Sequence, residues 1–148
     1  MISLHQRNVF NNSIQQLLIT ALVVPTFTIN IKALLMNWHF IQDTEDLQNA
    51  LDLSYQQPVM IFKHSTRCPV SFMAKRKVES SWSFPDDVII PFFLDLITFR
   101  KLSQEIATTL EVEHQSPQII LLKDGKATFH ASHHSIDTDD LKPLVQPG

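Results

Sequence analysis

The chain has 148 residues, of which 44% are hydrophobic, enough for one domain with a sizeable core. Its formal net charge of -3 at pH 7 and its pI near 6.1 give no electrostatic reason to bind nucleic acid or an acidic membrane. It contains two glycines and one cysteine, which excludes a glycine-rich phosphate loop, a dinucleotide-binding fingerprint and a disulfide within the chain.

The first 35 residues differ in composition from the rest of the chain. They contain no acidic residue, and Leu17 to Phe27 is a strongly apolar run. Three interpretations are open: a secretory signal, a transmembrane helix, or translated sequence upstream of a start at Met36. The run has no clean small-residue cleavage site and Pro25 interrupts it, which counts against the first two. We expect residues 1–35 to be an N-terminal extension, either upstream of the true start or a disordered, apolar leader, and residues 36–148 to form the domain.

The domain sequence predicts the order helix, strand, helix, strand, helix, strand, strand, helix. The first helix begins at 43–45, and its apolar face consists of Leu47, Ala50, Leu51 and Tyr55. The other expected elements are a strand over Pro58–Lys63, a helix from Cys68 to about Ser81, a strand over Val88–Asp95, a helix over Ile97–Leu110, a strand over Gln118–Leu122, a strand over Ala127–Ala131, and a helix over Thr138–Val145 capped by Asp137. In the second helix, the apolar residues are Val70, Phe72, Met73, Ala74 and Val78.

The only cysteine, Cys68, follows a buried strand and a polar turn and begins the second helix. Ser65 and Thr66 are good N-cap types, and Pro69 is tolerated in a first helical turn. A helix N-terminus favours an anion, so the pattern predicts a reactive thiolate at Cys68, with Arg67 adding a positive charge. The alternative is a small buried structural cysteine. The strand, the turn and the neighbouring arginine favour the reactive one.

Three blocks of this sequence resemble one family. Lys63–Ser71 (KHSTRCPVS) is similar to the signature of the bacillithiol-system redox proteins, the YtxJ-like monothiol bacilliredoxins. Val112–Gln118 (VEHQSPQ) resembles the proline loop of that family, and Lys123–Lys126 with His130–His133 resembles its final hairpin. The blocks occur in the right order, and the resemblance covers roughly Met36 to Leu144.

The resemblance implies a thioredoxin-like fold, and the element order agrees with it. A strand–helix–strand unit followed by a helix and a β-hairpin is the thioredoxin arrangement, with Asp124-Gly125 as the hairpin turn. We therefore predict an α/β, three-layer fold whose central mixed sheet of about four strands is flanked by helices. The nearly continuous apolar run Val88–Asp95 is typical of a strand covered on both faces, and Pro91 places this strand next to the sheet edge or at a bulge.

For function, the resemblance implies a monothiol thiol–disulfide exchange protein. Cys68 would remove or carry a low-molecular-weight thiol, bacillithiol, on protein cysteines through a mixed disulfide. Ser71 occupies the place of a resolving cysteine and cannot attack a disulfide, although its hydroxyl could bind the Cys68 thiolate, so release needs a second thiol molecule. Ser116-Pro117 is expected close to Cys68 with a cis peptide bond, which leaves the Ser116 backbone free to pair with substrate.

Bacillithiol carries carboxylates, so positively charged neighbours of Cys68 would bind it. Lys63, Arg67 and His64 are the candidates, and His64 fits a hydrogen-bonded turn histidine equally well. The expected partners are bacillithiolated client proteins and a low-molecular-weight thiol. For the main domain we expect no nucleic acid, no membrane partner and a cytoplasmic location.

The histidines suggest a metal site as a further hypothesis. His130, His133 and His134 are close in sequence, but one cysteine and no nearby carboxylate pair do not complete a ligand set. We expect neither a metal nor a bound cofactor, and the role of these three residues stays open.

Two functional classes also stay open. One is an enzyme that turns over bacillithiolated proteins. The other is a non-catalytic binding or sensor protein of the same fold, whose Cys68 is modified under oxidative stress. Turnover separates them.

Overall fold

The computed structural model describes residues 36–145, so the predicted extension over 1–35 lies outside the described residues. The elements, in chain order, are β1 (His39–Phe40), α3 (Thr44–Leu53), β2 (Val59–His64), α4 (Pro69–Ser81), β3 (Ile90–Asp95), α5 (Arg100–Thr109), β4 (Gln118–Lys123), β5 (Lys126–Ser132), the 3-10 helices η1 (His133–Ser135) and η2 (Asp139–Leu141), and α6 (Lys142–Val145). No helix in this range is long and apolar enough to cross a membrane.

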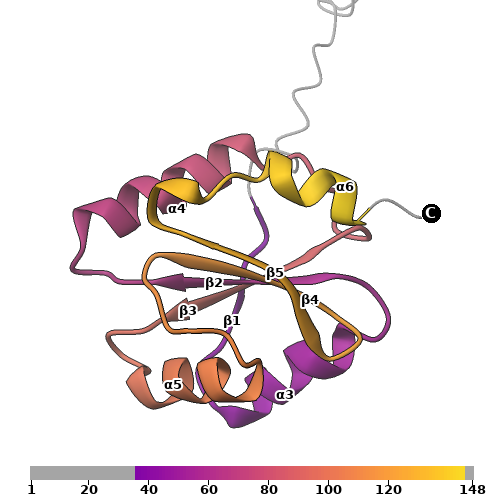
Figure 1. Ribbon diagram of the computed structural model, residues 1–148, viewed down its shortest axis with the longest axis horizontal. Helices are drawn as coiled ribbons and strands as arrows, with labels where there is room; N and C mark the ends of the chain where they lie inside the picture. Colours follow the sequence, from indigo (N-terminus) through magenta and orange to yellow (C-terminus); the bar gives the residue numbers. More distant parts are fainter. Residues whose placement is uncertain (1–35, 146–148) are drawn as a thin grey trace, which may run out of the picture. The chain divides into compact units, whose positions relative to one another are not determined.

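The strands form one mixed sheet in the order β1-β3-β2-β4-β5, with helices on both faces (Figure 1). β3 pairs in parallel with β1 and β2, whereas β4 is antiparallel to β2 and β5. Parallel pairing of β2 and β3 requires a crossover, which α4 supplies, while a tight turn joins β4 to β5. The predicted α/β, thioredoxin-like class is confirmed.

The sheet has five strands instead of the expected four. The additional strand, β1, has only two residues, too few to show any periodicity in the sequence. It lies at the edge and pairs with Phe92 and Phe93 of β3. β3 is therefore next to the edge, as Pro91 predicted.

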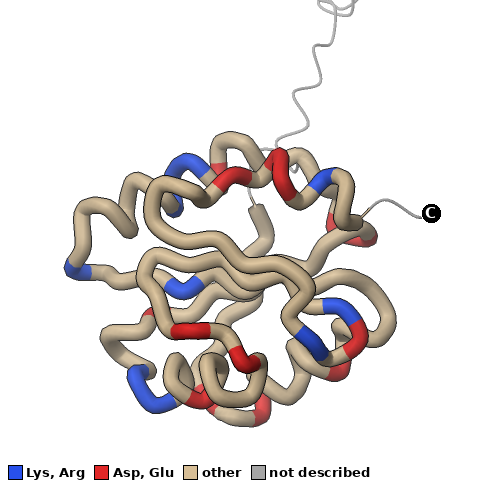
Figure 2. The backbone as a smooth tube through the Cα atoms, viewed as in Figure 1, with Lys and Arg blue, Asp and Glu red and all other residues tan. Residues whose placement is uncertain are grey.

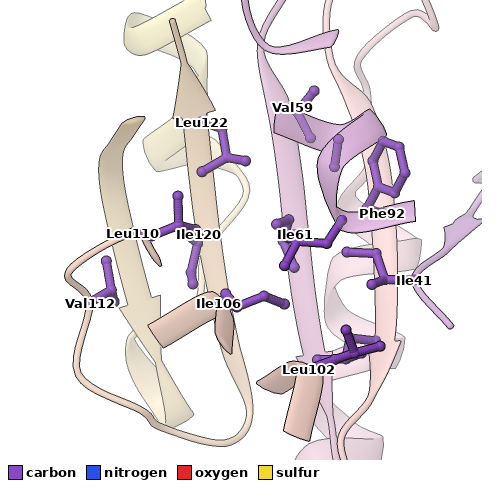
Figure 3. Close-up of a cluster of buried hydrophobic side chains, with 13 residues drawn as sticks. Ile41, Val59, Ile61, Phe92, Leu102, Ile106, Leu110, Val112, Ile120 and Leu122 are labelled. Atoms are coloured by element: carbon purple, nitrogen blue, oxygen red, sulfur yellow. The ribbon is translucent and has the colours of Figure 1, made fainter. Parts of the chain in front are cut away.

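Two hydrophobic clusters fill the layers, one on each face of the sheet. The first lies under α3 and α5 and consists of Ile41, Leu47, Ala50, Val59, Ile61, Phe92, Leu94, Leu102, Ile106, Leu110, Val112, Ile120 and Leu122 (Figure 3). The second lies under α4 and α6 and consists of Met60, Phe62, Ala74, Val78, Ile89, Phe93, Ile119, Leu121, Ala131, Ile136 and Leu141. β2 contributes to both clusters because successive side chains of a strand point to opposite faces.

Two expected details differ in the structure. The C-terminal helix is divided into η2 and α6, because Pro143 has no N–H to continue an α-helical ladder. Tyr55 follows α3 and is 65% exposed rather than part of an apolar face. Its hydroxyl lies over Gly125, where a Cβ would collide with it, and the backbone there has a φ of 72°. Glycine suits this turn for both reasons.

Charged residues are interspersed over both helical layers, and few lie on the central strands (Figure 2). β2 is an exception, because its six residues are all buried and include Lys63 and His64. A buried lysine and a buried histidine need polar partners, so such partners are expected around the end of β2.

We expect residues 36–148 to fold without the preceding segment, because the described residues alone form both buried clusters, from Ile41 to Leu141. The truncated chain should unfold cooperatively, with a midpoint within about 4 °C of that of the full chain. For a domain of this size, such a shift corresponds to a difference of less than ~1 kcal/mol in the free energy of unfolding. Circular dichroism melts of both proteins measure this. Aggregation or loss of the cooperative transition in the truncated chain would show that the first 35 residues belong to the fold.

Candidate functional site

Cys68 lies at the N-cap position of α4, with Pro69 as the first helical residue. Its backbone is extended, and its carbonyl accepts a hydrogen bond from the Phe72 N–H at 3.1 Å. The side chain is partly exposed. A thiolate here lies at the positive end of the helix dipole, which stabilises an anion. The predicted place of Cys68 at a helix N-terminus is confirmed.

Ser65 and Thr66 belong to the turn before α4 and do not cap the helix. The Ser65 N–H donates to Ser71 Oγ at 2.9 Å, and the Thr66 hydroxyl donates to Asp95 Oδ1 at 3.4 Å. The N-cap position belongs to Cys68, whose side chain makes no capping hydrogen bond. Arg67 is exposed beside it. The turn is thus held to α4 and β3, which fixes the backbone that presents the thiol.

Ser71 is fully buried, and its hydroxyl is directed to His64. Ser71 Oγ lies 2.8 Å from His64 Nδ1 and accepts from the Ser65 N–H, and no hydrogen bond within residues 36–145 joins it to the Cys68 sulphur. A hydroxyl can accept from Ser65 while it donates to an unprotonated Nδ1, with the ring proton on Nε2. The serine supports the turn rather than the thiolate that we expected it to bind.

His64 is 6% exposed and lies between aromatic rings. Its ring is stacked on Phe62 at 5.9 Å and tilted against Phe93 at 5.3 Å. Burial lowers the pKa of His64, the Lys75 charge lowers it further, and the Asp95 carboxylate opposes both. A buried neutral ring does not bind a carboxylate as a cation, so the predicted substrate contact of His64 is corrected. Its role is to support the turn.

Lys63 is fully buried on the opposite face of the sheet from His64. Its ammonium lies 2.7 Å from His114 Nδ1 and 3.4 Å from the Ser103 carbonyl oxygen. Burial lowers the pKa of Lys63 from 10.5 to about 8. At this depth Lys63 cannot contact a substrate directly, which corrects the predicted binding role. Of the predicted cationic neighbours, Arg67 is the one at the surface beside Cys68.

The Ser116–Pro117 bond is cis, as predicted. β4 starts at Gln118, which pairs with Lys63 near the end of β2. The proline loop and the Cys68 turn therefore lie at the same end of these two strands. The Pro117 carbonyl accepts from the His133 N–H at 3.0 Å. Ser116 has no backbone hydrogen bond to any residue in 36–145, and its buried Oγ has no partner there either. The backbone N–H and carbonyl of Ser116 are therefore unpaired within the described residues, whereas its hydroxyl oxygen is buried.

An open groove of about 520 Å³ runs between α4 and η1. Its lining residues are Pro69, Val70, Met73, Ala74, Lys77, His133, His134 and Ile136. Val70 and Met73 are 42% and 64% exposed, and Phe72 beside them is 55% exposed, so the first turns of α4 present apolar side chains to solvent. Of the apolar residues expected in this helix, only Ala74 and Val78 are buried. The groove begins one residue after Cys68.

The three clustered histidines occupy different places. His133 and His134 line the groove, and His130 is exposed on β5. His133 Nε2 lies 3.0 Å from Gln115 Oε1, which connects η1 to the proline loop. Within residues 36–145, no group of three or more His, Cys, Asp or Glu side chains is placed to hold a metal ion.

Three polar residues beside the site, His114, Ser103 and Gln118, were not predicted from the sequence. Gln118 is 1% exposed, and its Nε2 donates to the Glu113 carbonyl at 2.9 Å, which closes the proline loop. His114 was part of the family block but received no role. The available signal was a lysine inside an otherwise apolar strand, because a buried lysine requires a polar partner.

The family model of monothiol bacilliredoxin BrxC matches residues 39–141, well over half of the chain. Among solved structures, a protein described as an oxidoreductase with a thioredoxin fold is 20% identical, with 74% of this chain and 94% of that chain covered and a TM-score of 0.61. Malassezia sympodialis thioredoxin is 15% identical, with 75% and 90% covered and a TM-score of 0.59. A thioredoxin variant from Halobacterium salinarum is 20% identical, with 74% and 88% covered and a TM-score of 0.54. At these identities the structures show the fold alone.

Replacing Ser71 with Ala should lower the free energy of unfolding by about 1–3 kcal/mol, because the Ser65 N–H and the His64 ring lose a buried partner. Ser80→Ala is the matched control, since Ser80 lies exposed on the same helix and should change stability by no more than about 0.5 kcal/mol. Urea unfolding measures both. Equal effects of the two substitutions would contradict a supporting role for Ser71.

Lys63 should make stability depend on pH between about 8 and 10.5. In this window the unfolded chain keeps the Lys63 proton while the folded chain loses it, so the unfolded state binds more protons. The free energy of unfolding of the wild type should therefore rise with pH relative to Lys63→Met, and the difference should be flat below pH 8. Urea unfolding of both proteins across this range measures it. A constant or falling difference would contradict the burial of a titrating ammonium.

Proposed function

This chain belongs to the monothiol bacilliredoxin family, and on that premise we propose that it transfers a low-molecular-weight thiol from client protein cysteines to Cys68. The family gives it a thiol redox role. The observation that carries the finer proposal is the partly exposed Cys68 at the N-terminus of α4, in a chain without a second cysteine. We propose bacillithiol as the thiol and the cytoplasm as the compartment, since free protein thiols persist in reducing compartments.

In the first step, the Cys68 thiolate attacks the sulphur of the small thiol in the client's mixed disulfide. A new S–S bond forms between Cys68 and the small thiol, and the old one breaks. The client sulphur leaves with the electron pair and is protonated by solvent, so the client is reduced and Cys68 is oxidised. The dipole of α4 stabilises the attacking thiolate of Cys68, which is the form that reacts.

A second thiol molecule completes the cycle. Its thiolate attacks the sulphur of the small thiol in the Cys68 mixed disulfide and releases the Cys68 thiolate. The two small thiols leave as a disulfide, which an external reductant must recycle. No resolving attack comes from within the chain, because Ser71 is a buried hydroxyl that is bonded to His64. This single-thiol route agrees with the family assignment.

Three features favour docking of the disulfide at this end of the sheet. The open polar groups of Ser116 offer an N–H and a carbonyl to an extended client backbone. The groove beside Cys68 offers apolar contacts through Val70 and Met73. Arg67, exposed beside Cys68, adds a charge that favours the carboxylates of bacillithiol.

Incubating the full chain with a bacillithiolated peptide should release the peptide thiol and add one bacillithiol to Cys68, as seen by intact mass spectrometry. With free bacillithiol and a recycling reductant, the release should become multiple-turnover. Cys68→Ser should abolish both while leaving the melting curve unchanged, since serine is nearly isosteric. The same peptide carrying glutathione tests the choice of thiol.

Single modification of Cys68 without turnover would instead support the sensor interpretation. Absence of any adduct would remove the proposal.

A further inference from the structure

Lys63 is a buried cation that has no counter-ion among the described residues. It is 0% exposed, and none of the ion pairs formed within residues 36–145 includes it. Its ammonium is bound by a histidine nitrogen and a carbonyl oxygen. Desolvating a charge costs free energy that neutral partners compensate only in part, and apolar replacement of buried charges often stabilises a protein. A contribution to the stability of the fold therefore does not explain why a lysine occupies this buried position.

The partner of Lys63 belongs to the loop that leads into β4. An ammonium has only donors, so His114 Nδ1 accepts at 2.7 Å and the ring carries its proton on Nε2. Ser103 Oγ of α5 lies 3.3 Å from the same nitrogen. Burial and the neighbouring Lys63 charge both lower the pKa of His114, which keeps Nδ1 free to accept. His114 is itself exposed, so this contact joins the buried ammonium to a residue at the surface.

The same loop is held at several other points, which include two contacts of Gln115, one with His133 Nε2 at 3.0 Å and one from its N–H to Gln118 Oε1 at 3.4 Å. Gln118 of β4 donates to the Glu113 carbonyl at 2.9 Å, and His133 of η1 donates its N–H to the Pro117 carbonyl at 3.0 Å. Between these points Ser116 has no backbone hydrogen bond within residues 36–145. The contact of Lys63 with His114 joins this loop to β2, the strand that leads into the Cys68 turn.

We propose that Lys63 is a positioning residue for disulfide exchange: its ammonium holds His114 and thereby sets the Ser116–Pro117 loop relative to Cys68. This inference rests on the proposed function, because it concerns docking of the disulfide beside the thiol. Lys63 touches neither the substrate nor Cys68. Without its bond to His114 the loop loses its side-chain contact with β2, although the pairing of Gln118 with Lys63 in the sheet remains. The Ser116 backbone then no longer meets the incoming disulfide at the correct distance.

Two reactions of the same thiol separate positioning from general damage. Alkylation of Cys68 by iodoacetamide needs the thiolate but no docking at the loop. Exchange with a peptide that carries bacillithiol needs both, and the same peptide carrying glutathione is run in parallel. In the full chain, Lys63→Met should slow exchange by about tenfold to a hundredfold, the range for a reacting group displaced by about 1 Å. The alkylation rate of Cys68 in this variant should stay within about twofold of the wild type, because alkylation does not depend on the position of the loop.

Variants of His114 test the same contact from the surface. His114→Phe removes the acceptor and should slow exchange as Lys63→Met does, whereas His114→Asn keeps an acceptor oxygen near the place of Nδ1 and should retain most of the rate. The double variant of Lys63→Met and His114→Phe should be no slower than either single one, because the two side chains act as a unit. Lys126→Met, at an exposed position of β5, is the control for loss of one charge.

The outcomes distinguish failure of the positioning role from failure of the proposed function. Wild-type exchange rates in Lys63→Met or in His114→Phe would overturn the positioning role while leaving the proposed function intact. Equal slowing of exchange and alkylation would also overturn it, since that pattern indicates general damage at Cys68. A wild type that is alkylated but reacts with neither peptide would overturn the proposed function and this inference together.

Discussion

The structure of the site depends on the alternation of side chains along β2. This strand is at the centre of the five-stranded sheet, and all six of its residues are buried. Its last two residues are polar, and a strand sends them to opposite faces. His64 therefore meets α4 and Ser71, while Lys63 meets α5 and the loop before β4. One strand end thus supports the two segments that form the site.

On the face of α4, neutral hydrogen bonds fix the cysteine turn. Ser71 joins the Ser65 N–H to the His64 ring, and aromatic rings enclose the histidine. The Ser65 N–H, Ser71 Oγ and His64 Nδ1 all have partners, which reduces the cost of burying them. The sulphur itself stays outside this network, partly exposed at the helix N-terminus. A rigidly supported, partly exposed thiol suits a reaction in which one sulphur atom attacks the disulfides of different client proteins.

On the other face, a charge replaces the neutral network. Lys63 is retained among hydrophobic residues with a histidine as its closest partner, at a pKa of about 8. The groove beside α4 shows the opposite exception, because the apolar side chains of Val70 and Met73 are exposed next to Cys68. The buried charge of Lys63 contacts the proline loop, and the exposed apolar side chains line the groove beside the thiol. Departures of this kind concentrate at functional sites.

The sequence alone determined the class of fold and the place of Cys68 at a helix N-terminus, and it limited the Pro91 strand to a position next to an edge or at a bulge. These follow from local patterns: strand and helix periodicity, a proline in the first helical turn, and the missing N–H of a proline. Only the tertiary structure decided that Lys63 and His64 are buried and that Ser71 binds a histidine. It also decided that the closest partner of Lys63 is His114, 51 positions away in the chain. That pairing is set by the register of β2 against β4, which brings together residues whose separation in sequence carries no periodic signal.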